Sequence, residues 1–347
     1  MTRQHIGRTI RTAAACALAI LLCAARPASA AKSACEWEGV ERIVAIGDVH
    51  GAYDRFVEIL KVARLVDEDE RWIGGATHLV QLGDVVDRGD GSRKVLDLLR
   101  RLERDAQTAG GMVHLLLGNH EAARMLGDLQ FATDGEYEAF ASPNSEKVRR
   151  DYLRTLGAQG ARGHAAQKTP LGLVEMRLAF GRDGEYGRLL RQLPVTIKIN
   201  GIEFAHGGIS PSVAGMGCDK INEQVRRELT GDLDRTRAQP LSSLTARADG
   251  PLWYRGLAQQ PETFAPQMDE ILAKLRARAI VVGHTVAATG RITTRFDGRV
   301  IQIDTGMQPA YVQNGRASAL EIKGGEATAI YVDRRDPVHI AKGSGGS

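Results

Sequence analysis

Gly47-Asp48-Val49-His50-Gly51 and Gly83-Asp84-Val85-Val86-Asp87-Arg88-Gly89 each follow an apolar, strand-like run of this 347-residue chain. Three further segments have the same form: Gly118-Asn119-His120-Glu121, Ala205-His206-Gly207-Gly208 and Gly283-His284-Thr285. All five segments combine small residues with side chains that can bind metal ions. Because they recur at strand ends, we expect them to meet in one site at the carboxyl edge of a sheet.

Strand-like runs and helical periodicity alternate through the first third of the chain. Strands are predicted at 42–46, 77–82 and 112–117, and helices at 53–66 and 92–107. A strand, a site segment and a helix repeated in this order are typical of an α/β protein, in which ligands collect at the carboxyl ends of the strands.

The second half of the chain is richer in β structure. Two helices are predicted near 218–230 and 265–277. Short apolar and β-branched runs predict strands at 195–199, 202–205, 279–282, 300–304, 317–322 and 327–332. Helices that flank two sheets would account for this mixture, so the predicted fold class is α/β (α+β).

Residues from about 122 to 193 contain no site segment. The stretch 131–144 is polar and rich in turn formers, whereas 145–156 and 181–193 have helical character. We interpret 122–193 as a mostly helical insertion or cap over the site, where substrate choice is usually made. A purely structural helical lobe is the alternative.

The N-terminus has the three parts of an export signal. Arg3, Arg8 and Arg11 precede an apolar stretch at 12–25, and Ala28-Ser29-Ala30 has the form of a cleavage site. Residues 1–30 are therefore predicted to be a cleaved signal peptide that leaves no membrane anchor, with a retained signal anchor as the alternative. The protein would then be exported, to the periplasm in a Gram-negative cell and otherwise into the medium.

Removal of this leader changes the charge and cysteine content. The whole chain has 46 basic and 42 acidic residues, and four basic residues lie in the leader, so 42 of each kind remain. A neutral mature protein gives no reason to expect binding to nucleic acid. Cys35 and Cys218 remain, and they either form a disulfide bond in an oxidising compartment or stay as separate buried thiols.

The five segments offer enough ligands for two divalent cations. Asp84 is the candidate for a carboxylate that bridges both ions. The other ligands divide into Asp48 and His50 for the first ion, and Asn119, His206 and His284 for the second. Carboxylate, amide and imidazole ligands suit manganese, iron or zinc better than magnesium or calcium, and manganese and iron are favoured.

The remaining polar residues of the segments suit phosphate chemistry. His120 can protonate a leaving oxygen, and we expect Asp87, in preference to Glu121, to fix its tautomer. Arg88 can donate two hydrogen bonds to phosphate oxygens, and Arg255 is a second candidate for this clamp.

Each segment alone has a less specific explanation. A single Gly-Asp-Val-His-Gly would more often be a turn than a metal site. His78 and His114 lie in predicted strands without a site segment, so we expect them to be packing residues, and His164 and His339 have no predicted role. Five segments at five strand ends make coincidence the weaker explanation of the whole set.

Together, GDVHG, GDVVDRG, GNHE, HGG and GHT resemble the signature of the calcineurin-like metallophosphoesterases, within the phosphoprotein phosphatase branch. In that branch the chain is most similar to the bacterial Shewanella-like protein phosphatases. The resemblance implies a metallophosphoesterase-type core of two mixed β-sheets sandwiched between helices, in a catalytic domain at 31–335. It also implies hydrolysis by a hydroxide that bridges two metal ions, without a phosphoenzyme. The Gly/Ser-rich end of the chain predicts a flexible tail over 336–347.

The resemblance also assigns roles to residues of this chain. The family's metal ligands fall on Asp48, His50, Asp84, Asn119, His206 and His284. Its general acid falls on His120 and its first phosphate-binding arginine on Arg88, and Asn119 is expected to contact phosphate as well.

Two positions depart from the eukaryotic members of that branch. Their second arginine lies in a longer segment, whereas Trp253-Tyr254-Arg255-Gly256 resembles the Shewanella-like version, with Arg255 as the phosphate ligand. Their tyrosine-bearing loop is replaced near Asp304-Thr305-Gly306-Met307, and Tyr311 is the candidate substitute.

One function is expected, with two alternatives. The expected function is that of an exported phosphatase acting on phosphomonoesters, with phosphotyrosine or phosphoserine/threonine proteins as substrates. A dinucleoside tetraphosphate hydrolase is the alternative enzyme, against which Asp87-Arg88-Gly89 and export both argue. A non-catalytic metal-binding relative is the second alternative; it would be expected to lack His120, Arg88 or a bridging aspartate, and the sequence retains all of them.

Overall fold

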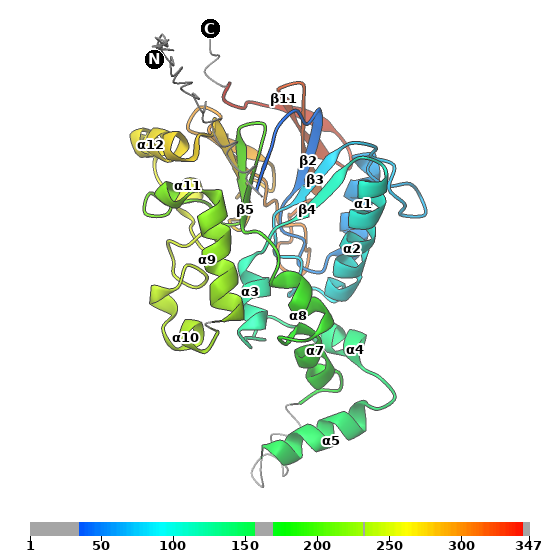
Figure 1. Cartoon of the computed structure of the whole chain (residues 1–347). Coiled ribbons are helices and arrows are strands. Elements are labelled where there is room, and N and C mark those ends of the chain that lie inside the picture. Colours follow the sequence, from blue (N-terminus) through cyan, green and yellow to red (C-terminus); the bar gives the residue numbers. More distant parts are fainter. Residues whose placement is uncertain (1–34, 157–168, 232, 343–347) are drawn as a thin grey trace, which may run out of the picture. The chain divides into compact units, whose positions relative to one another are not determined.

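The computed structural model describes residues 35–156, 169–231 and 233–342, and two six-stranded sheets form its centre (Figure 1). The predicted signal peptide at 1–30 and His164 lie outside the described residues. Within the described ranges, no helix has the length and apolar character needed to cross a membrane.

The first sheet has the strand order β12-β11-β10-β2-β3-β4. Its parallel half contains β2 (Arg42–Ile46), β3 (His78–Gln81) and β4 (Met112–Leu115). Its antiparallel half contains β10 (Ser318–Lys323), β11 (Glu326–Tyr331) and β12 (Arg335–Val338).

The second sheet has the order β1-β5-β6-β7-β9-β8. Parallel pairs join β6 (Ile202–Ala205) to β7 (Ala279–Val282), and β7 to β9 (Val300–Gln302). The remaining strands are β1 (Glu36–Trp37), β5 (Thr196–Ile199) and β8 (Thr293–Arg295). Both sheets are mixed, which confirms the predicted fold class.

Side chains that alternate along the strands build two apolar layers. In β2, Ile43 and Ala45 join a buried cluster with Phe204 and Val281 of the other sheet, whereas Val44 belongs to the cluster that includes the helices. Successive strand residues point to opposite faces, so one strand serves both layers. The first cluster therefore fills the space between the sheets.

Helices cover the outer faces of the sheets and fill the connections. The described helices are α1 (Tyr53–Val62), α2 (Ser92–Thr108), α3 (Asn119–Met125), α4 (Asp134–Phe140), α5 (Ser145–Thr155), α7 (Leu173–Phe180), α8 (Glu185–Leu190), α9 (Cys218–Thr230), α10 (Leu233–Ala238), α11 (Gly256–Gln259) and α12 (Ala265–Leu275). Figure 1 shows α1 and α2 beside the parallel strands β2, β3 and β4.

Several predicted element boundaries are wrong. The helix predicted at 53–66 ends at Val62, because Arg64 adopts a left-handed φ of 54° that breaks the helical backbone. The turn-rich stretch 131–144 contains α4, whose Thr133 accepts a hydrogen bond from the backbone of Glu136 as an N-cap.

The helix predicted at 181–193 and the start of the tail predicted at 336–347 are also wrong. The helix predicted at 181–193 covers only α8, and the preceding α7 ends where Gly181 adopts an extended backbone. Residues 336–338 are not a flexible tail, because they pair with β11 as part of the edge strand β12. Residues 343–347 lie outside the described part.

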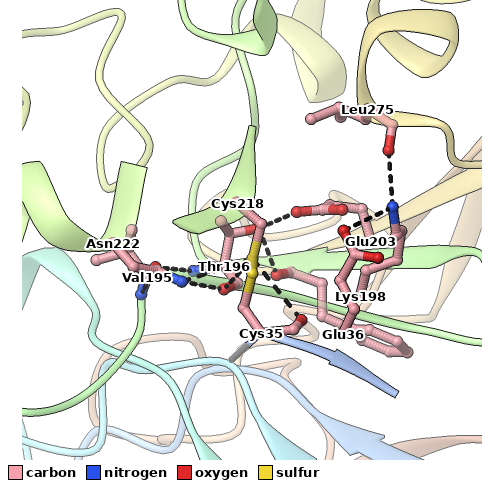
Figure 2. The surroundings of a disulfide bond; sticks show 10 residues. Cys35, Glu36, Val195, Thr196, Lys198, Glu203, Cys218, Asn222 and Leu275 are labelled. Carbon is pink, nitrogen blue, oxygen red and sulfur yellow. Dashed lines mark hydrogen bonds and ion pairs between the residues drawn. A yellow bond between two sulfur atoms is a disulfide. The ribbon is translucent and has the colours of Figure 1, made fainter. Parts of the chain in front are cut away.

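A disulfide bond joins Cys35 to Cys218, with the two Cα atoms 6.3 Å apart (Figure 2). It links the chain just before β1 to the first residue of α9. The backbone carbonyl of Cys35 accepts a hydrogen bond of 2.8 Å from the amide of Lys198 in β5. The pairing that the sequence left open is therefore present, and it fastens the short strand β1 to the body of the protein.

Candidate metal and phosphate site

The six predicted metal ligands lie just after strands of both sheets, and all are buried. Asp48 and His50 follow β2, Asp84 follows β3, and Asn119 begins α3 after β4. His206 and His284 follow the parallel strands β6 and β7. The carboxyl ends of parallel strands lie at the same edge of a sheet, so the order of the strands brings these side chains together.

The backbone at this edge is unusually tight. His50, Asp84 and His284 have left-handed φ values of 48°, 54° and 62°, which non-glycine residues seldom adopt. A Cβ atom at Gly118 would collide with Oδ1 of Asp84. Such conformations persist where the surroundings hold them, and they are typical of functional sites.

Asp84 lies at the centre of the predicted ligands. Its Oδ2 is 3.4 Å from Nε2 of His206 and 3.7 Å from Nε2 of His50. Two groups of side chains have ligand atoms close enough to share an ion, namely His50-Asp84-His120 and Asp84-His206-His284. Asp84 is the residue common to both groups, so its carboxylate can serve two cations at once.

Two histidines are oriented by the backbone. Nδ1 of His50 lies 2.9 Å from the carbonyl oxygen of Val86, and Nδ1 of His206 lies 2.9 Å from that of Leu82. When Nδ1 donates to these carbonyls, Nε2 of each ring faces the other ligands, where a metal ion can take the place of a proton. Nε2 of His206 lies 2.9 Å from Oδ1 of Asn119, so these two predicted ligands already converge.

His284 supplies the clearest test of whether cations fit this site. Its Nε2 is buried and has no hydrogen-bond partner among the described residues, although its backbone amide donates to Oδ1 of Asp48 at 3.0 Å. Burial and the charge of His206 lower the pKa of His284 to about 2, so the ring is neutral. A neutral buried imidazole with an unused lone pair is a suitable metal ligand.

The carboxylates of the site need positive charge. Burial and the neighbouring charge of Asp304 raise the pKa of Asp48 well above its usual range. Burial raises the pKa of Asp304 to about 6. A hydrogen bond from Gly306 opposes the rise, and the charge of Asp84 adds to it. Several buried carboxylates in one place are costly unless cations neutralise them. The donor set therefore fits divalent metal ions.

Asp304 was not among the predicted ligands. It is buried, and its carboxylate accepts a hydrogen bond of 3.0 Å from the amide of Gly306. The sequence did hold a signal, because Asp304 ends the predicted strand 300–304 just as the predicted ligands follow theirs.

His120 contacts Asp87 and is part of a buried charge network. Nδ1 of His120 lies 2.7 Å from Oδ2 of Asp87, and Arg124 donates to the other oxygen of that carboxylate. Arg124 also donates to both oxygens of Glu136, at 2.9 and 3.0 Å. Burial would raise the pKa of Asp87, but the hydrogen bond from His120 and the charge of Arg124 outweigh it and lower the pKa.

Arg124 and Glu136 are not among the residues predicted to form the site. Arg124 lies four residues after His120, a spacing that places both on one face of α3, so this residue could have been found. Glu136 lies in the first turn of α4, in a stretch predicted to be turns, and no local pattern pointed to it.

Glu121 binds backbone amides and does not orient His120, the role for which it was the alternative to Asp87. Its carboxylate accepts hydrogen bonds from the backbone amides of Gly118, Asp84, Val85 and Val86, at 2.8 to 3.2 Å. It is therefore not the partner of His120, and it shapes the backbone around Asp84.

Two arginines approach the site from different loops. Arg88 has Nη1 3.1 Å from Nε2 of His50 and Nη2 3.1 Å from Nε2 of His120. The ring of Tyr311 stacks on this guanidinium, with 3.6 Å between its centroid and Cζ. Arg255 is exposed, and its Nη1 donates to the carbonyl oxygen of His284 at 2.8 Å. All four predicted phosphate ligands, including Asn119, thus lie around the ligand groups.

The histidines without a predicted site role lie elsewhere. Nε2 of His114 is 3.0 Å from Nδ1 of His78, and the ring of Trp37 packs edge-on against His114 at 4.5 Å. His339 lies on the surface, 3.0 Å from Oδ1 of Asp297.

Comparison with known proteins gives one family over most of the chain. The sequence profile of the calcineurin-like phosphoesterases matches residues 41–288. The chain is 27% identical over 276 residues to Shewanella-like protein phosphatase 1 of Plasmodium berghei. This match covers 78% of this chain and 68% of the relative. It is 28% identical over 303 residues to Shewanella-like protein phosphatase 2 of Arabidopsis thaliana, covering 83% of this chain and 76% of the relative.

A solved structure has the same fold. The crystal structure of a cold-active protein-tyrosine phosphatase from a psychrophilic Shewanella species superimposes with a TM-score of 0.69 and 30% sequence identity. The match covers 87% of this chain and 81% of that chain.

Proposed function

Since this chain belongs to the calcineurin-like phosphoesterase family, we propose that it is an exported phosphatase that removes phosphate from phosphorylated proteins, at phosphotyrosine or at phosphoserine and phosphothreonine. The observation that carries the proposal is the position of Asp84 in both groups of metal-ligating side chains. A carboxylate shared by two cations is the central requirement of two-metal phosphoester hydrolysis.

The ligand set would hold two divalent ions, with manganese and iron favoured. Asp48 and His50, whose Oδ2 and Nε2 lie 3.9 Å apart, would hold one ion. Asn119, His206 and His284 would hold the other, and Asp84 would bind both. Bound ions would supply Lewis-acid polarisation of the phosphate and lower the pKa of an attacking water.

The chain's own residues would do the rest of the chemistry. Asp87, 2.7 Å from Nδ1 of His120, holds a proton on that nitrogen, so a proton on Nε2 can pass to the leaving ester oxygen. Nη1 and Nη2 of Arg88 lie 3.1 Å from Nε2 of His50 and of His120, and they would donate to two phosphate oxygens in place of these contacts when a substrate binds. Arg255 and Tyr311 would complete the phosphate clamp from the other loops.

Export is proposed from two independent features. Residues 1–30 have the composition of a cleaved leader, and the Cys35–Cys218 disulfide fits an oxidising compartment. The N-terminal sequence of the protein purified from the periplasm or the medium tests this proposal. A mature N-terminus at Ala31 supports it, and an intact Met1 in a membrane fraction contradicts it.

Phosphate release from a panel of substrates tests the enzymatic proposal. The panel contains phosphotyrosine and phosphoserine peptides of one sequence together with diadenosine tetraphosphate, each with Mn²⁺ and with a chelator. Asp84→Asn is the inactive variant, and Asp69→Asn on the surface is its matched control. Metal-dependent release from peptides supports the proposal. Turnover of the dinucleotide alone would assign the alternative enzyme, and no turnover at all would favour the non-catalytic relative.

A further inference from the structure

Two aromatic rings border the phosphate-binding side of the site. Phe131 lies between α3 and α4, and Tyr311 lies between β9 and β10. Their ring centroids are 5.5 Å and 3.6 Å from Cζ of Arg88. The ring of Phe131 also lies 5.1 Å from that of His120, and the ring of Tyr311 lies 5.9 Å from that of His50. Both rings therefore adjoin Arg88, which is expected to hold phosphate, and each also lies beside a histidine of the site.

Both rings keep much of their surface open to solvent. The exposed fraction is 45% for Phe131 and 48% for Tyr311, which is high for large apolar or aromatic side chains. A single exposed apolar side chain needs no explanation, but two exposed rings beside one predicted phosphate ligand form an apolar rim around a polar site. A substrate that reaches the site can cover this surface.

Hydrogen bonds tie both loops to the metal-ligand segments. The backbone amide of Arg88 donates to the carbonyl oxygen of Phe131 at 2.9 Å. On the other side, Nε2 of Gln308 donates to the carbonyl oxygen of His50 at 3.0 Å, and the amide of Tyr311 donates to the carbonyl oxygen of Gln308 at 3.1 Å. The two rings are therefore held in place before a substrate binds, which lowers the entropic cost of using them.

The chemistry of the ester decides which substrate this rim would recognise. In an aryl phosphate the aromatic ring is bonded directly to the ester oxygen. When the phosphate binds at Arg88, that ring lies within reach of Phe131 and Tyr311. Aromatic pairs contribute beyond simple burial, whereas the methylene of phosphoserine offers too little surface to cover a ring.

We propose that Phe131, together with Tyr311, is a specificity-determining residue that packs against the aromatic ring of an aryl phosphate ester. The inference rests on the proposed phosphatase function and extends it to a side chain in the 122–193 region. The rings could instead be purely structural and only hold Arg88 by cation–π contact. Loss of Phe131 would then weaken the binding of all phosphates alike.

Binding of phenylphosphonate and methylphosphonate separates these two cases. Neither compound has an ester oxygen to leave, so their difference reports contact with the ring rather than leaving-group chemistry. Calorimetry on the Mn²⁺-loaded protein would measure both dissociation constants for the wild type, Phe131→Ala, Phe131→Leu and Phe131→Tyr. Ile73→Ala removes another exposed apolar side chain and serves as the control.

We expect the wild type to prefer phenylphosphonate, and Phe131→Ala to lower this preference by about 2- to 12-fold, the range expected for one aromatic pair. Phe131→Leu should lose most of the preference, Phe131→Tyr should keep it, and the affinity for methylphosphonate should stay unchanged. In turnover, Phe131→Ala should lower kcat/KM for a phosphotyrosine peptide more than for the phosphoserine peptide of the same sequence.

Two results would overturn the inference if the wild type releases phosphate. One is an equal loss of affinity for both phosphonates in Phe131→Ala, and the other is an unchanged preference for phenylphosphonate in that variant. A wild type that releases no phosphate from any monoester would instead overturn the proposed function on which the inference rests.

Discussion

His120 and Asp87 are joined by a 2.7 Å contact between Nδ1 and Oδ2, and both side chains are almost completely buried. The same carboxylate is bound on its other oxygen by Arg124, so its position is fixed from two sides. A histidine held in this way keeps its Nε2 directed at the ligand cluster, where that atom lies 3.9 Å from Oδ2 of Asp84. The pair is therefore placed where the predicted proton donor is needed, next to the predicted metal centre.

Removing the acid from this pair should impair protonation of the leaving group. We expect His120→Ala and Asp87→Asn each to lower kcat by about 100-fold or more on a poor leaving group such as an alkyl phosphate. The loss should be smaller for 4-nitrophenyl phosphate, whose leaving group needs little protonation. Steady-state kinetics on both substrates, with metal content measured in parallel, make the comparison. Equal losses on the two substrates would remove His120 from the acid role.

Breaking the Arg124 network should unfold the protein more easily. Arg124 is buried between Asp87 and Glu136, so Arg124→Met leaves two carboxylates without their cation. We expect a loss of about 3–5 kcal/mol in the free energy of unfolding, measured by urea denaturation. Arg149→Met breaks an exposed pair with Glu146 and is the matched control, with little expected effect. Similar losses for both variants would contradict this account.

Asp304 should support the metal site without being one of the predicted ligands. Burial and, after it, the charge of Asp304 raise the pKa of Asp48, so Asp304 adds negative charge beside the predicted position of the first ion. We expect Asp304→Asn to weaken Mn²⁺ binding by about 10- to 100-fold, as for other supporting residues of metal sites. Calorimetric titration of the metal-free protein measures this directly. An unchanged affinity would leave Asp304 with a structural part only.

Glu203 should make stability depend on pH, away from the metal centre. Burial in β6 raises its pKa from 4.5 to about 7, although Thr196 and Lys198 partly oppose the rise. The folded state then keeps a proton that the unfolded state releases above about pH 4.5. The stabilisation is complete below that pH and is lost as the pH rises to about 7, a change of up to about 3 kcal/mol.

Urea denaturation between pH 4.5 and pH 8 checks this expectation. Glu203→Gln cannot titrate, so its stability relative to the wild type should increase across this interval. The exposed Glu326→Gln controls for the loss of one carboxylate. Parallel pH profiles for the wild type and Glu203→Gln would show that Glu203 does not carry the dependence.

The meeting of the predicted ligands could be foreseen from the sequence because local pattern and topology agree. Each of Asp48, Asp84 and Asn119 follows an apolar run that becomes a parallel strand, and parallel strands bring their carboxyl ends to one edge. Tertiary contacts between distant segments had no such signal. Glu136 reaches Asp87 across 49 residues, and nothing in the local sequence specified that contact.

The short edge strand β12 was not predicted, for a related reason. The strand β12 contains Pro337 and, within the described part of the chain, pairs only with β11, so its formation depends on register with a neighbour rather than on its own composition. The Cys35–Cys218 bond was undecided in the same way, because the distance between two cysteines is a property of the fold.

Metal stoichiometry is the most direct test of the central claim that Asp84 serves two ions. The wild type and Asp84→Asn would be loaded with Mn²⁺, freed of excess metal and analysed for metal per chain, with Asp69→Asn as the surface control. We expect two ions per chain in the wild type and in the control, and loss of metal from both sites in Asp84→Asn, together with loss of phosphate release. Two tightly bound ions and full turnover in Asp84→Asn would contradict it.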